Sequence, residues 1–232
     1  MRNQFLAILV AATAIVSSAA GASRPNEPHS SGAAPFVPPA VSYTESMTED
    51  DAARLQQERV AACVVKARRG MVLKALQRDP WEPAARHMLE NALDAKCLDN
   101  IQMVMPPDLL RGAYYQELYR ERFGARAPAL APAPIDFRGK PGGKMTKDAT
   151  VEIALREFGD CVVRRDLSDA QALILSLPGD PQETDALAAL MPQFNACLVR
   201  GSQWTLDRGL ISAILSEVVY REAVASNGEA PN

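Results

Sequence analysis

Histidine is scarce in this chain, which has only His29 and His87 among its 232 residues. His29 lies in a Pro- and Ser-rich stretch, so a histidine-bound metal or a Ser-His-Asp triad would depend on His87. Glu90 follows His87 at a helical spacing that could bring both side chains to one metal ion. His87 falls outside the apolar stripe of its predicted helix, however, and an exposed helix face is the stronger interpretation. We therefore predict no metal and no cofactor.

Other signatures of catalysis are absent as well. No Gly-x-Ser-x-Gly stretch marks a nucleophile, and no Cys-x-x-Cys pair marks a redox centre. Gly142-Gly143-Lys144 is followed by Met145, where a phosphate-binding loop needs Ser or Thr. We predict no catalytic residue.

After the first 22 residues the chain has no apolar run long enough to cross a membrane. Those first residues hold Arg2, an apolar run from Phe5 to Val16, and small residues that allow cleavage after Ala20 or Ala22. This order is typical of a secretory signal peptide. No cysteine lies at the cleavage site, which argues against a lipoprotein. We expect export to the periplasm or secretion.

A strong net charge is also missing, since the formal value is −3. The charge is uneven: Asp50 to Phe123 carries 12 basic and 11 acidic residues, and Asp148 to Glu222 carries 6 and 12. The first stretch is thus +1 and the second −6. Such mild values give no reason to expect nucleic acid as a partner. The expected partner is an envelope component or another protein.

What the chain does contain is an internal repeat. Four anchors recur in the same order about a hundred residues apart. They are Cys63-Val64-Val65 and Cys161-Val162-Val163, Asp79-Pro80-Trp81-Glu82 and Asp180-Pro181-Gln182-Glu183, Cys97 and Cys197, and Tyr119-Arg120-Glu121 and Tyr220-Arg221-Glu222. The repeat predicts a chain built from two related copies.

The repeated Asp-Pro-x-Glu motif predicts the start of a helix. Asp79 and Asp180 are suited to the N-cap position, and the proline that follows each occupies N1 without losing a hydrogen bond. Glu82 and Glu183 are placed to reach back to the cap amide. Each helix is expected to end close to the second cysteine of its copy.

The remaining apolar periodicity is also helical, so we predict an all-α fold. The alternation of Ile101, Met103 and Met105 is also compatible with a short strand. The other expected helices are Thr48 to Ala67 with a break at Gly70, a turn or two over Met71–Arg78, Pro106 to Phe123 stopped by Gly124, Thr146 or Thr150 to Val162, a short helix capped by Ser168, and Thr205 to Ala223. The expected domain plan is a signal peptide (1–22), a disordered leader (23–47), repeat 1 (48–124), a linker (125–147), repeat 2 (148–224) and a frayed tail (225–232).

The linker is expected to be extended, because it holds four prolines, three glycines and five basic residues against one acid. Ile135 and Phe137 are its two candidate attachments to a core.

Four cysteines in an exported chain indicate two disulfides, for which three connectivities exist. The repeat favours Cys63 with Cys97 and Cys161 with Cys197, because each copy then holds its own pair.

One difference between the copies indicates candidate binding residues. Aligned on Tyr119 and Tyr220, the first copy has Arg111, Tyr114 and Tyr115 where the second has Ser212, Leu215 and Ser216. Tyr and Arg are common in binding hot spots. The alternative is that these tyrosines belong to the edge of the core.

The run Phe158-Gly159-Asp160-Cys161-Val162-Val163, together with Tyr220-Arg221-Glu222, resembles predicted exported, cysteine-paired proteins of Gram-negative bacteria that have no assigned activity. The resemblance covers both copies and carries over no catalytic residue. The first copy departs from it, with Ala61-Ala62 before Cys63.

These observations favour an exported helical binding or structural protein of the cell envelope. The alternative is an envelope enzyme with an acidic site between the repeats. Inward-facing acids in a deep pocket would favour the enzyme, whereas a shallow apolar or Tyr-lined groove would favour the binding protein.

Overall fold

The computed structural model describes residues 47–98, 105–126, 129–138, 145–199 and 204–228. Within these ranges the chain forms eight α-helices and no strand, which confirms the predicted all-α class. All of them belong to one compact unit, Pro35–Asn232. The signal peptide and the leader, apart from Met47, lie outside the described residues. The helices are α1 (Glu49–Leu76), α2 (Pro83–Ala92), α3 (Ala95–Leu98), α4 (Pro107–Arg122), α5 (Lys147–Arg165), α6 (Leu167–Leu175), α7 (Pro181–Cys197) and α8 (Arg208–Ser226).

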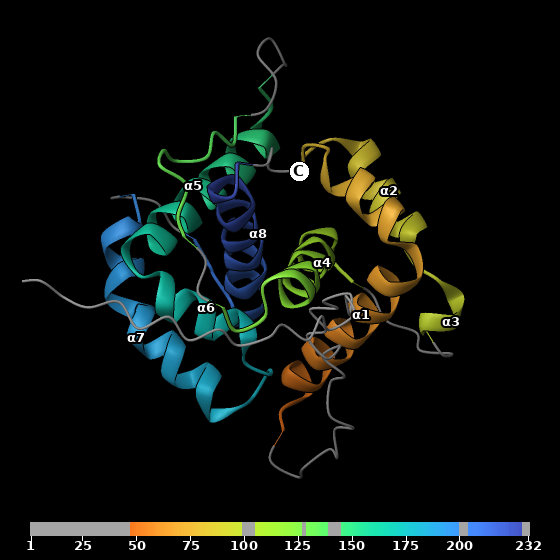
Figure 1. Ribbon diagram of the computed structural model, residues 1–232, viewed down its shortest axis with the longest axis horizontal. Coiled ribbons are helices and arrows are strands. Elements are labelled where there is room, and N and C mark those ends of the chain that lie inside the picture. The colour runs from red at the N-terminus through yellow and green to blue at the C-terminus, as the bar shows by residue number, and fades with distance from the viewer. Residues whose placement is uncertain (1–46, 99–104, 127–128, 139–144, 200–203, 229–232) are drawn as a thin grey trace, which may run out of the picture. The chain divides into compact units, whose positions relative to one another are not determined.

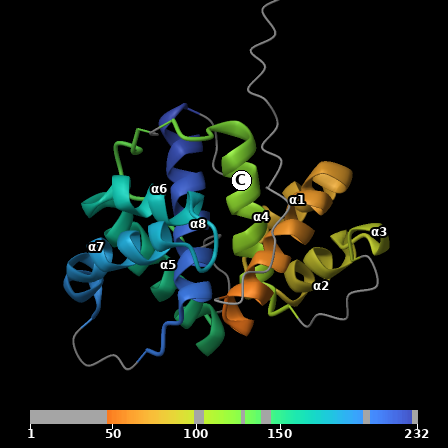
Figure 2. The same cartoon turned by 90° about the horizontal axis from the view of Figure 1, so that it is seen from below.

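Helices α4 and α8 pack against each other along the centre of this unit (Figure 1). Helices α1 to α3 lie on the side of α4, and α5 to α7 lie on the side of α8, as the perpendicular view in Figure 2 also shows. We refer to α1–α4 as the first helical set and to α5–α8 as the second. The α4–α8 contact is the seam between them.

The seam is unusually close at Gly112 of α4 and Ala213 of α8. A Cβ atom at Gly112 would lie 2.2 Å from the Cβ of Ala213 and 2.3 Å from its Cα. Only glycine allows two helix backbones to approach so closely. Further along the seam the rings of Tyr115 and Tyr220 pack with centroids 5.4 Å apart.

Helix α1 is longer than predicted. Its start is confirmed, because the Thr48 hydroxyl accepts a hydrogen bond from the Asp51 amide at 3.1 Å. The predicted break is present but lies two residues before Gly70: Arg68 has non-helical backbone angles (φ −137°, ψ 33°) and forms a kink, after which the helix continues to Leu76. Val72, Ala75 and Leu76 are buried, so packing of the last two turns keeps this stretch helical.

The two Asp-Pro-x-Glu motifs have different structures. The second starts α7 at Pro181 as predicted, but the first forms a turn, and α2 begins only at Pro83 with Glu82 as its N-cap. The physical reason is the extra proline, because Pro83 takes the N1 position that Pro80 was expected to hold. Helix α2 also ends early, at Ala92, so Cys97 belongs to the separate short helix α3.

Other boundaries differ by a few residues. Helix α6 is capped by Asp166 rather than Ser168, and α8 starts at Arg208 behind Asp207 rather than at Thr205. The end of α4 is as predicted, with Gly124 in the left-handed region at φ +58°. Of the residues with an alternating pattern, only Met105 is described.

The segment that was expected to be an extended linker is packed where it is described. Phe137 is 4% exposed, and Ile135 packs against the core from a partly buried position. Residues 129–138 therefore contact the second helical set instead of running free of it.

Candidate functional site

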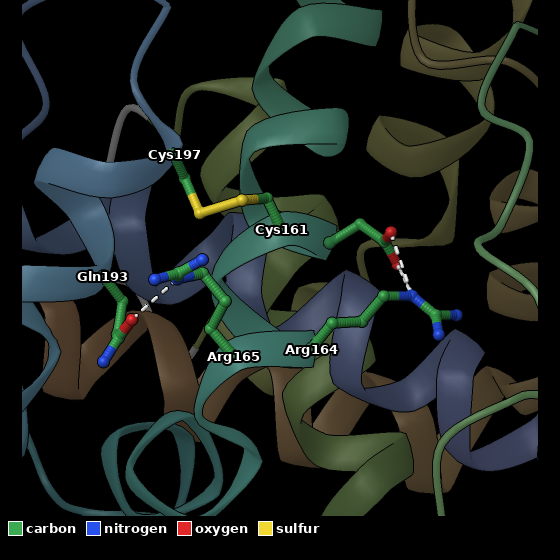
Figure 3. The surroundings of a disulfide bond; sticks show 6 residues. Cys161, Arg164, Arg165, Gln193 and Cys197 are labelled. Atoms are coloured by element: carbon green, nitrogen blue, oxygen red, sulfur yellow. Dashed lines mark hydrogen bonds and ion pairs between the residues drawn. A yellow bond between two sulfur atoms is a disulfide. The ribbon is translucent and has the colours of Figure 1, made fainter.

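The disulfides pair as predicted. Cys63 of α1 is bonded to Cys97 of α3, and Cys161 of α5 to Cys197 of α7. Figure 3 shows the second bond beside Arg165, which donates a hydrogen bond to Gln193 at 2.8 Å. Each bond lies within one helical set, and none crosses the seam, since all four cysteines are used.

The candidate binding residues Arg111, Tyr114 and Tyr115 are buried. Their relative exposures are 2%, 0% and 0%, so they form no accessible face. The reason is the position of α4, which contacts α1 and α2 on one side and α8 on the other. The Tyr114 hydroxyl has no hydrogen-bond partner among the described residues, and burial raises its pKa.

Arg111 is instead the centre of a buried ion pair across the seam. Its guanidinium donates to both carboxylate oxygens of Glu217, at 3.1 Å each. It also donates to the Leu76 carbonyl at 3.0 Å and to the Tyr115 hydroxyl at 3.1 Å. This bidentate geometry joins α4 to α8 and holds the end of α1.

Glu217 is a buried, ion-paired carboxylate that was not among the candidate residues predicted from the sequence. Arg156 of α5 donates to it at 2.9 Å and Arg221 at 3.3 Å, in addition to Arg111. Burial acts to raise the pKa of Glu217, but these three positive charges outweigh it and hold the pKa far below its usual range. A signal was available, since Glu217 is the one charged residue between Arg208 and Arg221.

Two small cavities flank the seam. One, of about 10 Å³, is lined in part by Asp108, Glu152, Arg156 and Glu217. This volume holds at most a single water molecule. The other, of about 30 Å³, lies between α1, α4 and α8 beside Ser212. Neither cavity admits an organic substrate.

The larger of these cavities is bordered by a second polar cluster. Gln116 donates to Glu58 at 3.0 Å and to the Ile174 carbonyl at 2.9 Å. Arg120 donates to the other oxygen of Glu58 at 2.7 Å. Gln116 and Arg120 both donate to the Ile174 carbonyl, so this cluster joins α1 and α4 to the end of α6.

Glu117 lies nearby on α4 and is 7% exposed. Burial raises its pKa to about 6, and Arg120 offsets only part of this increase. The proton therefore stays on Glu117 to a higher pH in the folded chain than in the unfolded chain.

A third buried cluster fixes the segment 129–138. Glu222 accepts a hydrogen bond from the Ala131 amide at 2.7 Å, and Arg164 donates to the Ala131 carbonyl at 3.1 Å. Arg164 also pairs with Asp160 at 3.1 Å and with Glu222. Burial and a hydrogen bond with Asp160 raise the pKa of Glu222. These interactions tie the segment to α5 and α8.

The first turn of α7 is linked to α1 by another ion pair. Arg54 donates to both oxygens of Glu183 and to Asp51. Glu183 accepts from the Gly179 amide at 2.8 Å, rather than from the Asp180 amide as the capping motif predicted. This pair is a further connection between the helical sets.

A groove lies between α6 and α7, and we call it the α6/α7 groove. It is shallow and has a volume of about 510 Å³. It is lined by Asp169, Ala172, Leu175, Ser176, Gln182, Asp185, Ala186 and Ala189. None of these eight residues is basic, and two are acidic.

His87 and Glu90 are both exposed on α2. Within the described ranges, no three His, Cys, Asp or Glu residues are grouped so as to hold a metal ion. No helix in these ranges has the length and hydropathy needed to span a bilayer. Comparisons with protein-family models, curated proteins and solved structures find no match to this chain.

Proposed function

We propose that this chain is an exported helical protein of the cell envelope that acts by binding or assembly rather than by catalysis. The observation that carries the proposal is the size and position of the cavities. The buried ionisable groups at the seam are paired around cavities of about 10 and 30 Å³, whereas larger hollows lie open at the surface. These are the α6/α7 groove, of about 510 Å³ with four apolar and four polar lining residues, and a polar hollow of about 350 Å³ beside Lys74 and Glu82. By the criterion stated above, this distribution favours a binding protein.

The alternative was an enzyme with an acidic site between the repeats. Acidic residues do meet beside the seam, where Asp108, Glu152 and Glu217 line one cavity. A general acid or base needs a pKa near the working pH and access to a substrate. Glu217 is ion-paired to three arginines and lines a cavity with no room for a substrate, so the geometry does not favour this alternative.

We also propose that the two helical sets are the two copies of the sequence repeat, joined by residues 125–147. The support comes from the seam. Aligned on Tyr119 and Tyr220, Gly112 and Ala213 are equivalent positions, and they are the two residues that meet at the closest approach. Equivalent residues contact each other only at a two-fold axis, as in a symmetric dimer.

The two cavities support the same symmetry. The repeat relates the residues that line one cavity to those that line the other. For this comparison α1 and α5 are aligned on Cys63 and Cys161, and α4 and α8 on Tyr119 and Tyr220. The equivalent pairs are Arg54 and Glu152, Gln57 and Leu155, Glu58 and Arg156, Leu109 and Leu210, Ala113 and Ile214, and Gln116 and Glu217. In two of these pairs, Arg54 with Glu152 and Glu58 with Arg156, the charges are exchanged. We infer one ancestral arrangement whose halves diverged in charge.

Export is part of the proposal. The features that support it are the signal-like residues 1–22 and the two disulfides, which are typical of oxidising compartments. The resemblance to exported proteins of Gram-negative bacteria points to the periplasm.

The proposal is tested by cross-linking the mature chain, residues 23–232, in native envelope extract. Ala189→Arg places a large charged side chain in the α6/α7 groove, and Ala84→Arg is the matched control at an exposed alanine of α2. We expect wild type and Ala84→Arg to cross-link a defined component that Ala189→Arg loses. Equal cross-linking by all three proteins, or no cross-linking by any of them, would reject a binding function for the groove. Chemical conversion of an envelope component by the purified chain would favour the enzyme.

A further inference from the structure

We propose that the occupant of the α6/α7 groove is a second copy of this chain, which inserts the exposed face of α1 around Met71. We call this face, formed by Lys66, Gly70, Met71 and Lys74, the basic face. The inference rests on the proposed function and names the partner for its groove. It assigns the chain to head-to-tail assembly.

The lining of the groove combines apolar side chains with negative charge. Ala172 and Leu175 of α6 and Ala186 and Ala189 of α7 provide the apolar part. Asp169 and Asp185 provide one carboxylate from each helix. A fitting ligand therefore has a small apolar side chain with positive charges on both sides of it.

The basic face has this composition. Met71 is 42% exposed, although large apolar side chains are more often buried. Gly70 and Lys74 are exposed one turn apart beside Met71 on the part of α1 that follows the kink at Arg68, and Lys66 is exposed just before that kink. A Cβ atom at Gly70 would have no neighbour within 4 Å, which leaves open space beside the methionine. Methionine is flexible and fills irregular apolar grooves well.

Charge complementarity favours a second copy over an unrelated protein. The basic face belongs to the stretch with a formal charge of +1, and the groove to the stretch with −6. Opposite charges on the two ends of one chain attract the unlike ends of two copies and steer their encounter.

The arrangement of the helices determines the type of assembly. Helix α1 packs against α4, whereas α6 packs against α7 and α8 (Figure 1), and the basic face shares no residue with the groove. One copy therefore has both surfaces available at once. An interface between two different surfaces adds copies one after another instead of stopping at a dimer, unless the rotation closes a ring.

The test is sedimentation of the mature chain over a range of concentrations. At low ionic strength we expect the weight-average mass to rise past that of a dimer as the concentration rises. In about 0.5 M salt it should fall to that of the monomer, because screening is then effective over a few ångströms.

Charge-reversal variants give the sharper test. Lys66→Glu with Lys74→Glu, and Asp169→Lys with Asp185→Lys, should each weaken association about tenfold or more. An equimolar mixture of the two double variants should associate again, because each then offers the charge that the other lacks. Lys96→Glu with Asp148→Lys reverses exposed charges elsewhere and should associate like wild type. Circular dichroism checks that every variant is folded.

A mature chain that stays monomeric at low ionic strength would overturn the inference, as would a mixture that fails to associate. Loss of binding to vesicles of anionic lipid in the Lys66→Glu, Lys74→Glu variant, with no self-association in wild type, would assign the basic face to a membrane instead. If the chain is monomeric but Ala189→Arg loses an envelope component, the self-assembly inference fails and the proposed binding function stands. If both experiments are negative, both fail.

Discussion

Replacement of Gly112 by alanine tests whether the close seam between α4 and α8 holds the fold together. The added Cβ would lie 2.2 Å from the Cβ of Ala213. Carbon atoms in contact are about 3.5–4.0 Å apart, so the helices must separate by more than about 1 Å. The atoms that must move include the Cα of Ala213, which no change of rotamer can displace.

The magnitude follows from what the separation breaks. Overpacking costs about 1–3 kcal/mol. Stretching the 3.1 Å hydrogen bonds between Arg111 and Glu217 removes about 1.5–3 kcal/mol more. Alanine returns about 0.5–1 kcal/mol through its higher helix propensity. We expect a net loss of about 3 kcal/mol, which corresponds to about 6–12 °C in Tm for a domain of this size.

The assay is urea and thermal denaturation by circular dichroism without reductant. Gly70→Ala is the matched control, because this mid-helix glycine has open space where the Cβ would go. It should raise stability by about 0.5–1 kcal/mol. Gly159→Ala should fall between the two, since its Cβ would meet the Ile214 side chain at 2.6 Å and that side chain can move. If Gly112→Ala is as stable as Gly70→Ala, the seam is not as close as described and the argument is wrong.

Four further predictions follow from the same contacts. Replacing Cys63 and Cys97 by alanine opens a loop with a sequence separation of 34 and should lower the free energy of unfolding by about 4 kcal/mol, measured by urea denaturation. Glu117→Gln should stabilise the chain by about 2 kcal/mol at pH 8 and have no effect below about pH 4.5. The reason is that folding raises the pKa of Glu117 to about 6, so wild type loses stability as the pH rises from about 4.5 to about 6. A difference that is the same at all pH values would contradict this. Glu217→Gln removes the paired carboxylate of Arg111 and leaves Arg156 with Glu152 alone, so it should cost about 3–5 kcal/mol in the same assay, and a change below about 1 kcal/mol would show that the ion pairs are not desolvated. Protein recovered from the periplasm or medium should lack its first 20 or 22 residues by intact-mass measurement, and a full-length mass would contradict export.

Local signals in the sequence predicted several helix ends correctly. Thr48 and Thr146 cap α1 and α5 with their side chains, as expected, because a hydroxyl before a helix has orphan amides within reach. Gly124 stops α4 for an equally local reason, its positive φ. These features depend only on residues a few positions apart.

The errors arose where distant residues decide the outcome. The break in α1 lies at Arg68 rather than at Gly70, and the buried Val72, Ala75 and Leu76 keep the helix packed beyond it. Pro83 is a local exception, since a competing proline displaced the expected helix start.

The candidate binding residues show the same limit. Tyr and Arg on one side of a helix predict a binding surface only when that side is exposed to solvent. Arg111, Tyr114 and Tyr115 are buried because α4 has neighbours on both sides, which no local pattern reveals. The lone Glu217 in an apolar helix was the better indicator, since a buried carboxylate requires a partner.

The pairing of the cysteines in chain order has a consequence for how the protein matures. Each disulfide joins two cysteines that follow each other in the sequence, Cys63 with Cys97 and Cys161 with Cys197. Under the proposed export, a polypeptide that emerges from a translocation channel with its N-terminus first exposes the first pair before the third cysteine appears. Stepwise oxidation during emergence then yields the native bonds directly. Maturation should need an oxidant but no enzyme that reshuffles disulfides.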